Sequence, residues 1–142
     1  MDNFEDEGQP SGRLTTRTIA MPADTNPAGD IFGGWVLSQM DMAAGISAGQ
    51  RAQGRVVTVA LEGMSFIRPV RVGDILGVYT HIVRVGRSSI DINVECWVRR
   101  RRIGRREKVT EALFKFVALD EQGNSRAVPS IDELPQYVES DF

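Results

Sequence analysis

The stretch that decides the fold is Asn26–Asp41, NPAGDIFGGWVLSQMD, in which a polar, glycine-rich turn runs directly into an apolar segment with one acid. Asp41 carries the only formal charge between Ile31 and Gly49. An unpaired carboxylate is costly to bury, so this one has to be neutralised, paired or used. The stretch therefore predicts a long apolar helix whose single acid requires an explanation.

This helix is expected to begin near Gly33 or Gly34 and to end by Gly49 or Gly54. The turn formers of Met21–Asp30 predict a structured loop before it. Strand-like segments surround these elements: residues 13–20 before the loop, and a segment from residue 55, then 75–85, 90–98 and 109–119 after the helix.

The segment from residue 55 has β-branched side chains at both its odd and its even positions, which predicts a strand covered on both faces. A tight hairpin is expected at Gly86–Ser88 and another near Ile103 and Gly104. The element order favours an α+β fold, a curved antiparallel sheet wrapped around a central helix. One such sheet leaves strand edges open, so a dimer with edge pairing is its natural completion.

The 142 residues suit a single domain, and the net charge of −2 gives no overall attraction to nucleic acid. We expect a flexible lead-in over residues 1–12, a domain over 13–129 and a tail over 130–142. The start has no secretory signal, and a lone cysteine, Cys96, is compatible with a reducing cytosol, so the expected location is cytoplasmic. Polar residues within 31–49 favour a buried helix over a membrane span.

Four blocks in the same order resemble the hotdog-fold acyl-CoA thioesterases of the bacterial YciA type. They are MPADTNPAGDIFGGWVLSQMD, GRVVTVALEGMSFIRPVRVGD, VGRSSIDINVECWV and TEALFKFVALDEQG, and the likeness spans about residues 14–129. The resemblance implies hydrolysis of an acyl-CoA thioester, of short to medium chain, at a site shared by two subunits. It also implies a homodimer, a trimer of dimers beyond it, and no cofactor other than the CoA of the substrate.

By this resemblance Asp41 is the catalytic carboxylate, and the helix start at Gly33 and Gly34 binds the thioester carbonyl. The resemblance gives Asn26 a supporting polar role, and it matches Thr58 to a hydroxyl that approaches the acid from the facing subunit. Asp41 lies about 10 Å along one helix from Gly34, too far for both to grip one reacting carbon. Spacing and family pattern together predict a site built across the dimer.

The sequence leaves the role of Asp41 open between general base and nucleophile. Each assignment also has a structural alternative. The alternatives are an ion pair of Asp41 with Arg51 or Arg55, a turn that Asn26 forms with its own backbone, and plain packing of Thr58 within its strand.

The phosphates of CoA require positive charge or free N–H groups, and the resemblance places candidates in two segments. These are Ser65, Phe66, Arg68 and Pro69 in the first, and Gly86, Arg87, Ser88 and Ser89 in the second. The alternative for each arginine is a solvated surface charge.

The basic run Arg99–Arg106 is read first as a solvated hairpin tip, with CoA phosphate contact and nucleic-acid binding as alternatives. No aromatic platform is interleaved with its arginines, so no nucleic-acid partner is expected. The polar residues within 31–49 likewise give no expectation of a membrane partner.

His81 and Cys96 are isolated, so no metal site is expected. The absence of histidine from residues 26–54 separates the chain from the hotdog dehydratases. The competing functional hypothesis is a non-catalytic acyl-CoA-binding sensor with the same fold.

Overall fold

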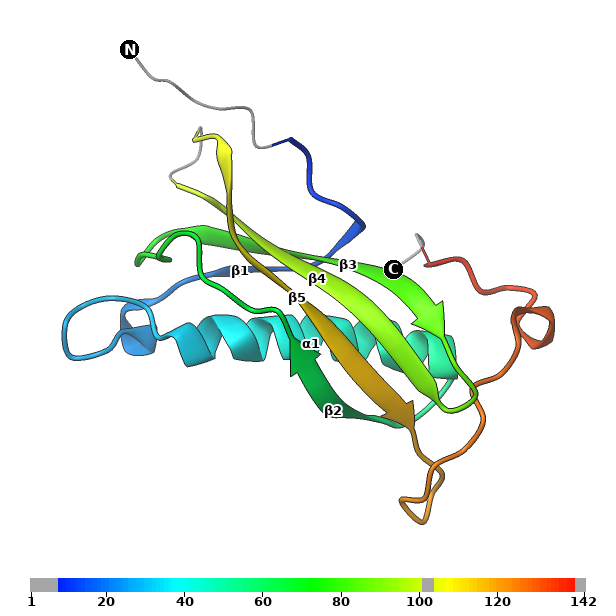
Figure 1. Ribbon diagram of the computed structural model, residues 1–142. Helices are drawn as coiled ribbons and strands as arrows, with labels where there is room; N and C mark the ends of the chain where they lie inside the picture. The colour runs from blue at the N-terminus through cyan, green and yellow to red at the C-terminus, as the bar shows by residue number, and fades with distance from the viewer. Residues whose placement is uncertain (1–7, 101–103, 140–142) are drawn as a thin grey trace.

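The computed structural model describes residues 8–100 and 104–139. The described residues form five strands, one long helix and two short 3-10 turns, arranged as in Figure 1. In chain order they are β1 (Arg13–Ile19), η1 (Pro22–Asp24), α1 (Gly33–Ala52), β2 (Val56–Glu62), β3 (Ile75–Val85), β4 (Ser89–Arg99), β5 (Arg106–Ala118) and η2 (Ile131–Glu133).

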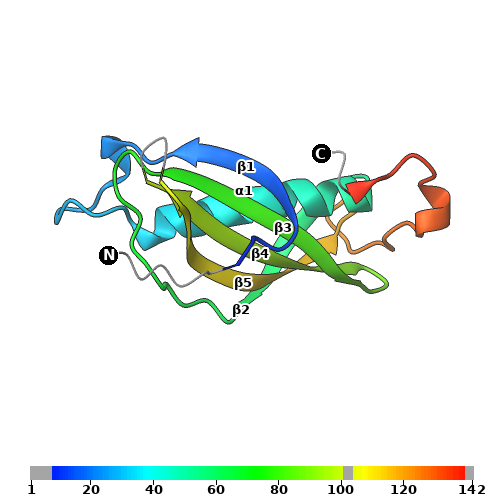
Figure 2. The same ribbon diagram turned by 90° about the horizontal axis from the view of Figure 1, so that it is seen from above.

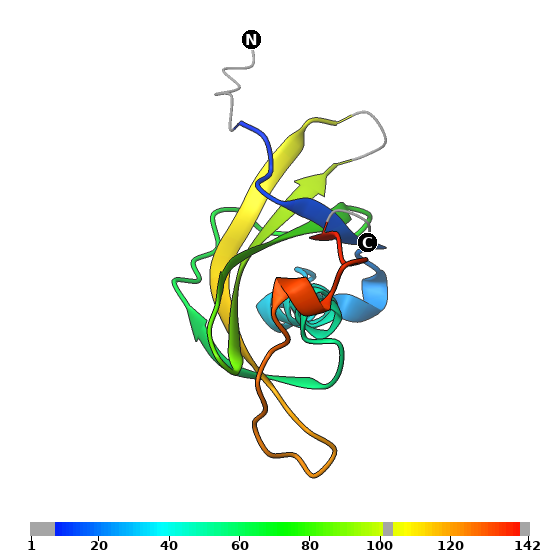
Figure 3. The ribbon, with the colours of Figure 1, turned by 90° about the vertical axis from the view of Figure 1, so that its right-hand side faces the viewer.

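All the strand pairs are antiparallel, and the sheet order is β1-β3-β4-β5-β2. The sheet curves around α1, which lies along its concave side (Figure 3). This arrangement confirms the predicted α+β fold, and the helix bounds agree with the expected glycine limits.

Period-two alternation builds the inner face of the sheet, because successive side chains of a strand point to opposite faces. Every second residue of β4 from Ile90 to Val98 is buried, as are Phe114 and Phe116 of β5. Small residues on α1 allow the helix to approach this layer closely. The helix residues buried in the core are Val36, Met40, Ala43, Ala44, Ala48 and Ala52.

The expectation that the β2 segment is covered on both faces is wrong for the single chain. Among the described residues β2 pairs only with β5 and forms one edge of the sheet, and most of its residues are exposed. The exposed apolar residues of this edge and of the neighbouring helix flank are Met42, Ile46, Val57, Val59 and Leu61. They leave one side of α1 and β2 open.

The C-terminal segment lies beside the last turn of α1, at the end of the molecule away from the helix start (Figure 2). Arg51 Nη1 donates to the carbonyl of Pro129 at 2.6 Å, and its guanidinium lies 5.9 Å from the ring centroid of Tyr137. Arg126 Nη2 also donates to the carbonyl of Ala52 at 2.8 Å. These contacts provide acceptors for a buried arginine and a donor for a carbonyl of the last helical turn.

The proposed division into lead-in, domain and tail remains a prediction. Residues 1–7 of the lead-in, the hairpin tip at 101–103 and the last three residues of the tail lie outside the described residues. Within the described residues, no helix combines the length and apolarity needed to cross a membrane.

Candidate active site

Asp41 lies on the side of α1 that faces β2, and its side chain is half-buried rather than enclosed. Thr58 Oγ1 donates a hydrogen bond of 2.6 Å to Asp41 Oδ1. Because β2 runs beside the helix, this hydroxyl comes from the same chain, which corrects the expectation that it approaches from a facing subunit. The hydrogen bond occupies one carboxylate oxygen and fixes the orientation of the group.

The alternative of an Asp41–arginine pair is not found. The guanidinium of Arg51 is engaged with the C-terminal segment. No ion pair of Asp41, with Arg55 or any other cation, occurs among the described residues. The carboxylate thus accepts a hydrogen bond from a neutral donor on Oδ1, and its Oδ2 has no partner among the described residues.

The start of α1 presents unused backbone donors. The first N–H groups within the helix to bond backwards are those of Trp35 and Val36, which both donate to the carbonyl of Phe32. The residue before the helix supplies no side-chain cap. The N–H groups of Gly33 and Gly34 therefore have no partner among the described residues, and they lie where the helix dipole favours an anion.

Gly34 keeps the approach to these amides clear, since a Cβ at this position would meet no atom within 4 Å. A Cβ at Gly33 would lie 3.4 Å from the Phe66 ring, so that ring borders the helix start. The sequence places Phe66 33 residues beyond Gly33, and the fold brings the two together.

Asn26 organises the loop before the helix. Its Oδ1 accepts from the N–H groups of Ala28 at 2.9 Å and Asp30 at 3.1 Å. The side-chain oxygen of Asn26 therefore forms the turn, as the structural alternative for this residue predicts. These two bonds also fix the orientation of the amide, so the side chain offers Nδ2 as a donor to anything bound near the helix start.

Asp24 is a positioning residue that the sequence reading missed. Its carbonyl accepts from the Phe32 N–H at 3.1 Å, and its carboxylate accepts from the Met21 N–H at 3.0 Å. These bonds close the loop on both sides of Asn26. An acid in the first turn after Pro22 is the sequence signal that points to such a capping role.

The carboxylate and the helix-start amides belong to one unbroken helix, and Asp41 is the seventh residue after Gly34. At 1.5 Å per residue their separation is about 10 Å along the axis. The chain thus holds two candidate half-sites, one with the acid and Thr58, the other with the helix-start amides and Asn26. The fold does not bring the two onto one small reacting group within a chain.

The expected CoA-binding residues separate into two groups. The loop after β2 lies near the helix start, where Arg68 Nη1 donates to the carbonyl of Lys108 at 2.8 Å. Two further backbone carbonyls of this loop are occupied, that of Ser65 by Thr110 and that of Pro69 by Arg100.

The hairpin Gly86–Ser89 lies at the opposite end of the sheet, near the C-terminal end of α1 (Figure 1). Its N–H and carbonyl groups hold the turn and the following segments: Gly86 N–H donates to Ser89, and the carbonyls of Arg87 and Ser88 accept from Val128 and Ala118. The 20-residue helix is about 30 Å long, so a single chain keeps the two groups of residues apart.

The arginines of the basic run occupy different positions in the sheet and have different partners. Arg100 pairs with Asp74 at 2.8 Å and with Glu107 at 3.0 Å, so it is a structural contact rather than a solvated charge. Arg99 and Arg106 face each other across β4 and β5. Arg101 and Arg102 lie outside the described residues. Within the described part of the chain, no cluster of three or more metal-ligating side chains occurs.

Known proteins are similar to this chain in both sequence and fold. Residues 28–104 match the family profile described as Thioesterase superfamily. Over 123 residues the chain is 55% identical to the acyl-CoA thioester hydrolase YciA of Escherichia coli K12, and the alignment covers 84% of this chain and 93% of that protein.

Two solved structures extend this similarity to three dimensions. One is a hexameric broad specificity acyl-coenzyme A thioesterase, at 52% identity and a TM-score of 0.84 over 91% of this chain and 90% of that one. It has also been solved as an aspartate-to-alanine mutant enzyme. The other is a hexameric thioesterase from Yersinia pestis, at 52% identity and a TM-score of 0.82 over 86% of this chain and 99% of that one.

Proposed function

Because the chain belongs to the Thioesterase superfamily, as its resemblance to the YciA-type enzymes indicates, we propose that it hydrolyses acyl-CoA thioesters to free acid and CoA. The observation that carries the proposal is the Asp41 carboxylate, held at 2.6 Å by Thr58 and free of any ion pair among the described residues. A structural acid in such an apolar helix is expected to pair with a cation. An acid with one free oxygen suits catalysis.

The helix start supplies the electrophilic half of the reaction. The N–H groups of Gly33 and Gly34 donate to the thioester carbonyl, and the negative charge that develops on its oxygen is stabilised by the same amides and by the helix dipole. Asn26 Nδ2 adds a third donor, because its own oxygen is committed to the loop. Gly34 leaves room for the acyl group to reach the backbone.

Asp41 of a partner subunit supplies the other half. As a general base it takes a proton from water, and the hydroxide adds to the carbonyl carbon. The tetrahedral intermediate then collapses, the C–S bond breaks, and the CoA sulfur leaves as a thiolate that takes a proton. As a nucleophile, the carboxylate adds to the carbonyl carbon and the C–S bond breaks, so that CoA leaves as a thiolate that takes a proton. Water then hydrolyses the resulting mixed anhydride to the free acid and the regenerated carboxylate. Thr58 serves both routes by holding Oδ1 and leaving Oδ2 to react.

A second copy of the chain completes the site. The open edge of β2 and the exposed apolar flank of α1 are the surfaces that dimerisation covers, because an unpaired strand edge beside apolar side chains is a template for association. Three such dimers form a hexamer, the assembly of two similar enzymes. CoA is bound near subunit boundaries, with Arg68 and Arg87 contacting its phosphates from different chains.

Acyl-CoA hydrolysis by Asp41→Asn tests this proposal. The amide keeps the size of the side chain but neither attacks a carbonyl nor accepts a proton from water. We expect turnover of a panel of short and medium acyl-CoAs to fall on the order of 100- to 10,000-fold, with the oligomer intact. Glu121→Gln, which removes an exposed carboxylate from the turn after β5, is the matched control.

Near wild-type turnover in Asp41→Asn contradicts the assignment of the carboxylate. A wild-type protein that binds acyl-CoA and releases no free CoA contradicts hydrolysis itself and favours the sensor hypothesis.

A further inference from the structure

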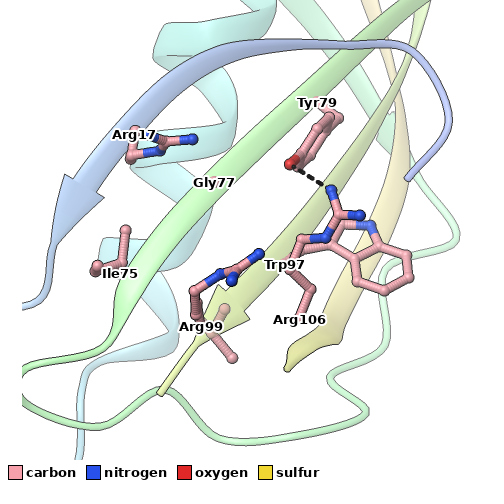
Figure 4. Close-up of a pocket in the computed structure, with 8 residues that line it drawn as sticks. Arg17, Ile75, Gly77, Tyr79, Trp97, Arg99 and Arg106 are labelled. Carbon is pink, nitrogen blue, oxygen red and sulfur yellow. Dashed lines mark hydrogen bonds between the residues drawn. The ribbon is translucent and has the colours of Figure 1, made fainter. Parts of the chain in front are cut away.

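A hollow lies on the outer face of the sheet, away from α1. It measures about 240 Å³ and is surrounded by three arginines, Arg17, Arg99 and Arg106 (Figure 4). Ile75 and Gly77 of β3 lie between them, and Tyr79 closes one side. The half-site residues Asp41, Gly33 and Gly34 belong to the helix, on the concave side, so the hollow is separate from the proposed reaction centre.

The strand register assembles this hollow from four strands. Arg17 of β1 lies opposite Gly77 of β3, which in turn lies opposite Trp97 of β4. One step along, Ile75 lies opposite Arg99, and Arg99 lies opposite Arg106 of β5. Neighbouring strands are about 4.8 Å apart. The long arginine side chains of β1, β4 and β5 therefore reach over the same shallow floor.

Gly77 produces the depression because it places no side chain on the outer face. A Cβ there would lie 3.2 Å from Leu14 Cδ1 and 3.3 Å from Tyr79 Cε2, in the space that the hollow occupies. The floor is apolar, with Ile75 beside the glycine. The hollow thus combines an apolar base with a cationic rim.

Among the described residues, no acid pairs with the three arginines of the rim. None of the residues that line the hollow is acidic. Neither Arg17 nor Arg99 forms a hydrogen bond or ion pair within the described residues. The groups that Arg106 contacts within the described residues are neutral, the Tyr79 hydroxyl at 3.4 Å and the Gln9 side chain.

The acids closest to this rim in sequence already have partners. Glu95 accepts from Trp97 Nε1 at 2.9 Å and from the Ser11 N–H at 3.2 Å. Glu107 is paired with Arg100. Three like charges held over one apolar floor repel one another, so an anion bound among them relieves that repulsion as well as forming hydrogen bonds.

We propose that this hollow binds the phosphoryl group of a small organic phosphate, with the organic part against the apolar floor. Phosphoryl oxygens suit the planar fork of guanidinium, which makes two parallel hydrogen bonds to such groups. A singly charged carboxylate leaves most of the rim charge unbalanced. The phosphoryl group belongs either to a free phosphorylated metabolite or to a CoA bound at a neighbouring subunit.

Pyrophosphate binding to the intact wild-type oligomer, measured by calorimetry at low ionic strength, is the direct test. We expect saturable binding that weakens as chloride is added, because exposed charges are screened. Arg17→Gln and Arg99→Gln should each weaken it about tenfold, the effect of one lost hydrogen bond to a charged group. Arg84→Gln removes the same charge from the far end of β3 and should leave binding unchanged.

Two further variants separate this hollow from the proposed reaction centre. Asp41→Asn should bind pyrophosphate as the wild type does, so the result does not depend on hydrolysis. Gly77→Ala should weaken binding by filling the floor while all three charges remain. Absence of saturable binding, equal binding by Arg17→Gln and wild type, or loss on Arg87→Gln alone overturns the proposal.

The source of the phosphoryl group is decided by kinetics on the same variants. If CoA of a neighbouring subunit supplies it, Arg99→Gln raises KM for acyl-CoA along with weakening pyrophosphate binding. If a free metabolite supplies it, only pyrophosphate binding weakens and KM is unchanged. Both results support a phosphoryl site, and they differ in what occupies it.

Discussion

Mixed oligomers of two inactive variants provide the sharpest test of a shared site. One variant is Asp41→Asn, which disables the acid half-site. The other is Asn26→Asp, which keeps an oxygen to accept from Ala28 and Asp30 but loses the Nδ2 donor and puts negative charge beside the thioester oxygen. Each variant alone is expected to be nearly inactive.

The expected recovery follows from the geometry of α1. Asp41 and the helix-start amides are about 10 Å apart along one helix, so each reaction centre takes its acid from one chain and its donors from the other. In a mixed dimer, one centre has both wild-type halves and the other has both defects. Random pairing at equal amounts makes about half of the dimers mixed, so activity should return to about a quarter of wild type.

The assay is CoA release after the two variants are unfolded together, mixed in equal amounts and refolded. Wild type and each variant alone, refolded in the same way, provide the reference values. Native mass spectrometry of chains with tags of different mass verifies that mixed dimers have formed. If they have formed and activity does not exceed the sum of the two variants, the two half-sites act within one chain and the shared-site reasoning is refuted.

Three further predictions concern single residues. Thr58→Val should lower kcat about tenfold, the value of one hydrogen bond to a partly exposed carboxylate, and Thr58→Ser should restore most of it; an unchanged kcat in the valine variant means that the hydroxyl only packs. Burial raises the pKa of Cys96 to about 12, so this thiol should not react with a disulfide reagent at pH 8 until the protein is denatured; rapid modification of the native protein contradicts that burial. Val59→Lys, at a residue 52% exposed on β2, should shift the protein towards monomers in sedimentation velocity, whereas Val83→Lys, 51% exposed on β3, should not; intact oligomers in the first variant exclude the β2 edge as the interface.

The regular elements were readable from local pattern alone. Alternation over residues 90–98 and the apolar run with a single acid predicted their elements because side-chain period follows directly from backbone geometry. The prediction that β2 is covered on both faces is wrong for a related reason. Period and composition describe a strand, but its place at the edge or the centre of a sheet is set by which strands pair with it.

The site was predictable only in part. Asp41 was distinctive as a lone charge in an apolar run, whereas the amide orientation of Asn26 depends on two loop N–H groups that only the folded loop brings near it. The origin of the hydroxyl beside the acid was predicted wrongly, since sequence spacing does not reveal that β2 of the same chain runs along that side of α1.

By itself the sequence determined the order of elements, the long helix and the acid within it, because these follow from residue type and from spacing along one backbone. The tertiary structure alone decided which groups meet: Thr58 with Asp41, Phe66 with the helix start, and three arginines from separate strands around one hollow. Such meetings depend on strand order and register, which bring together residues far apart in the chain. Periodicity extends along the chain and carries no information about distances across it.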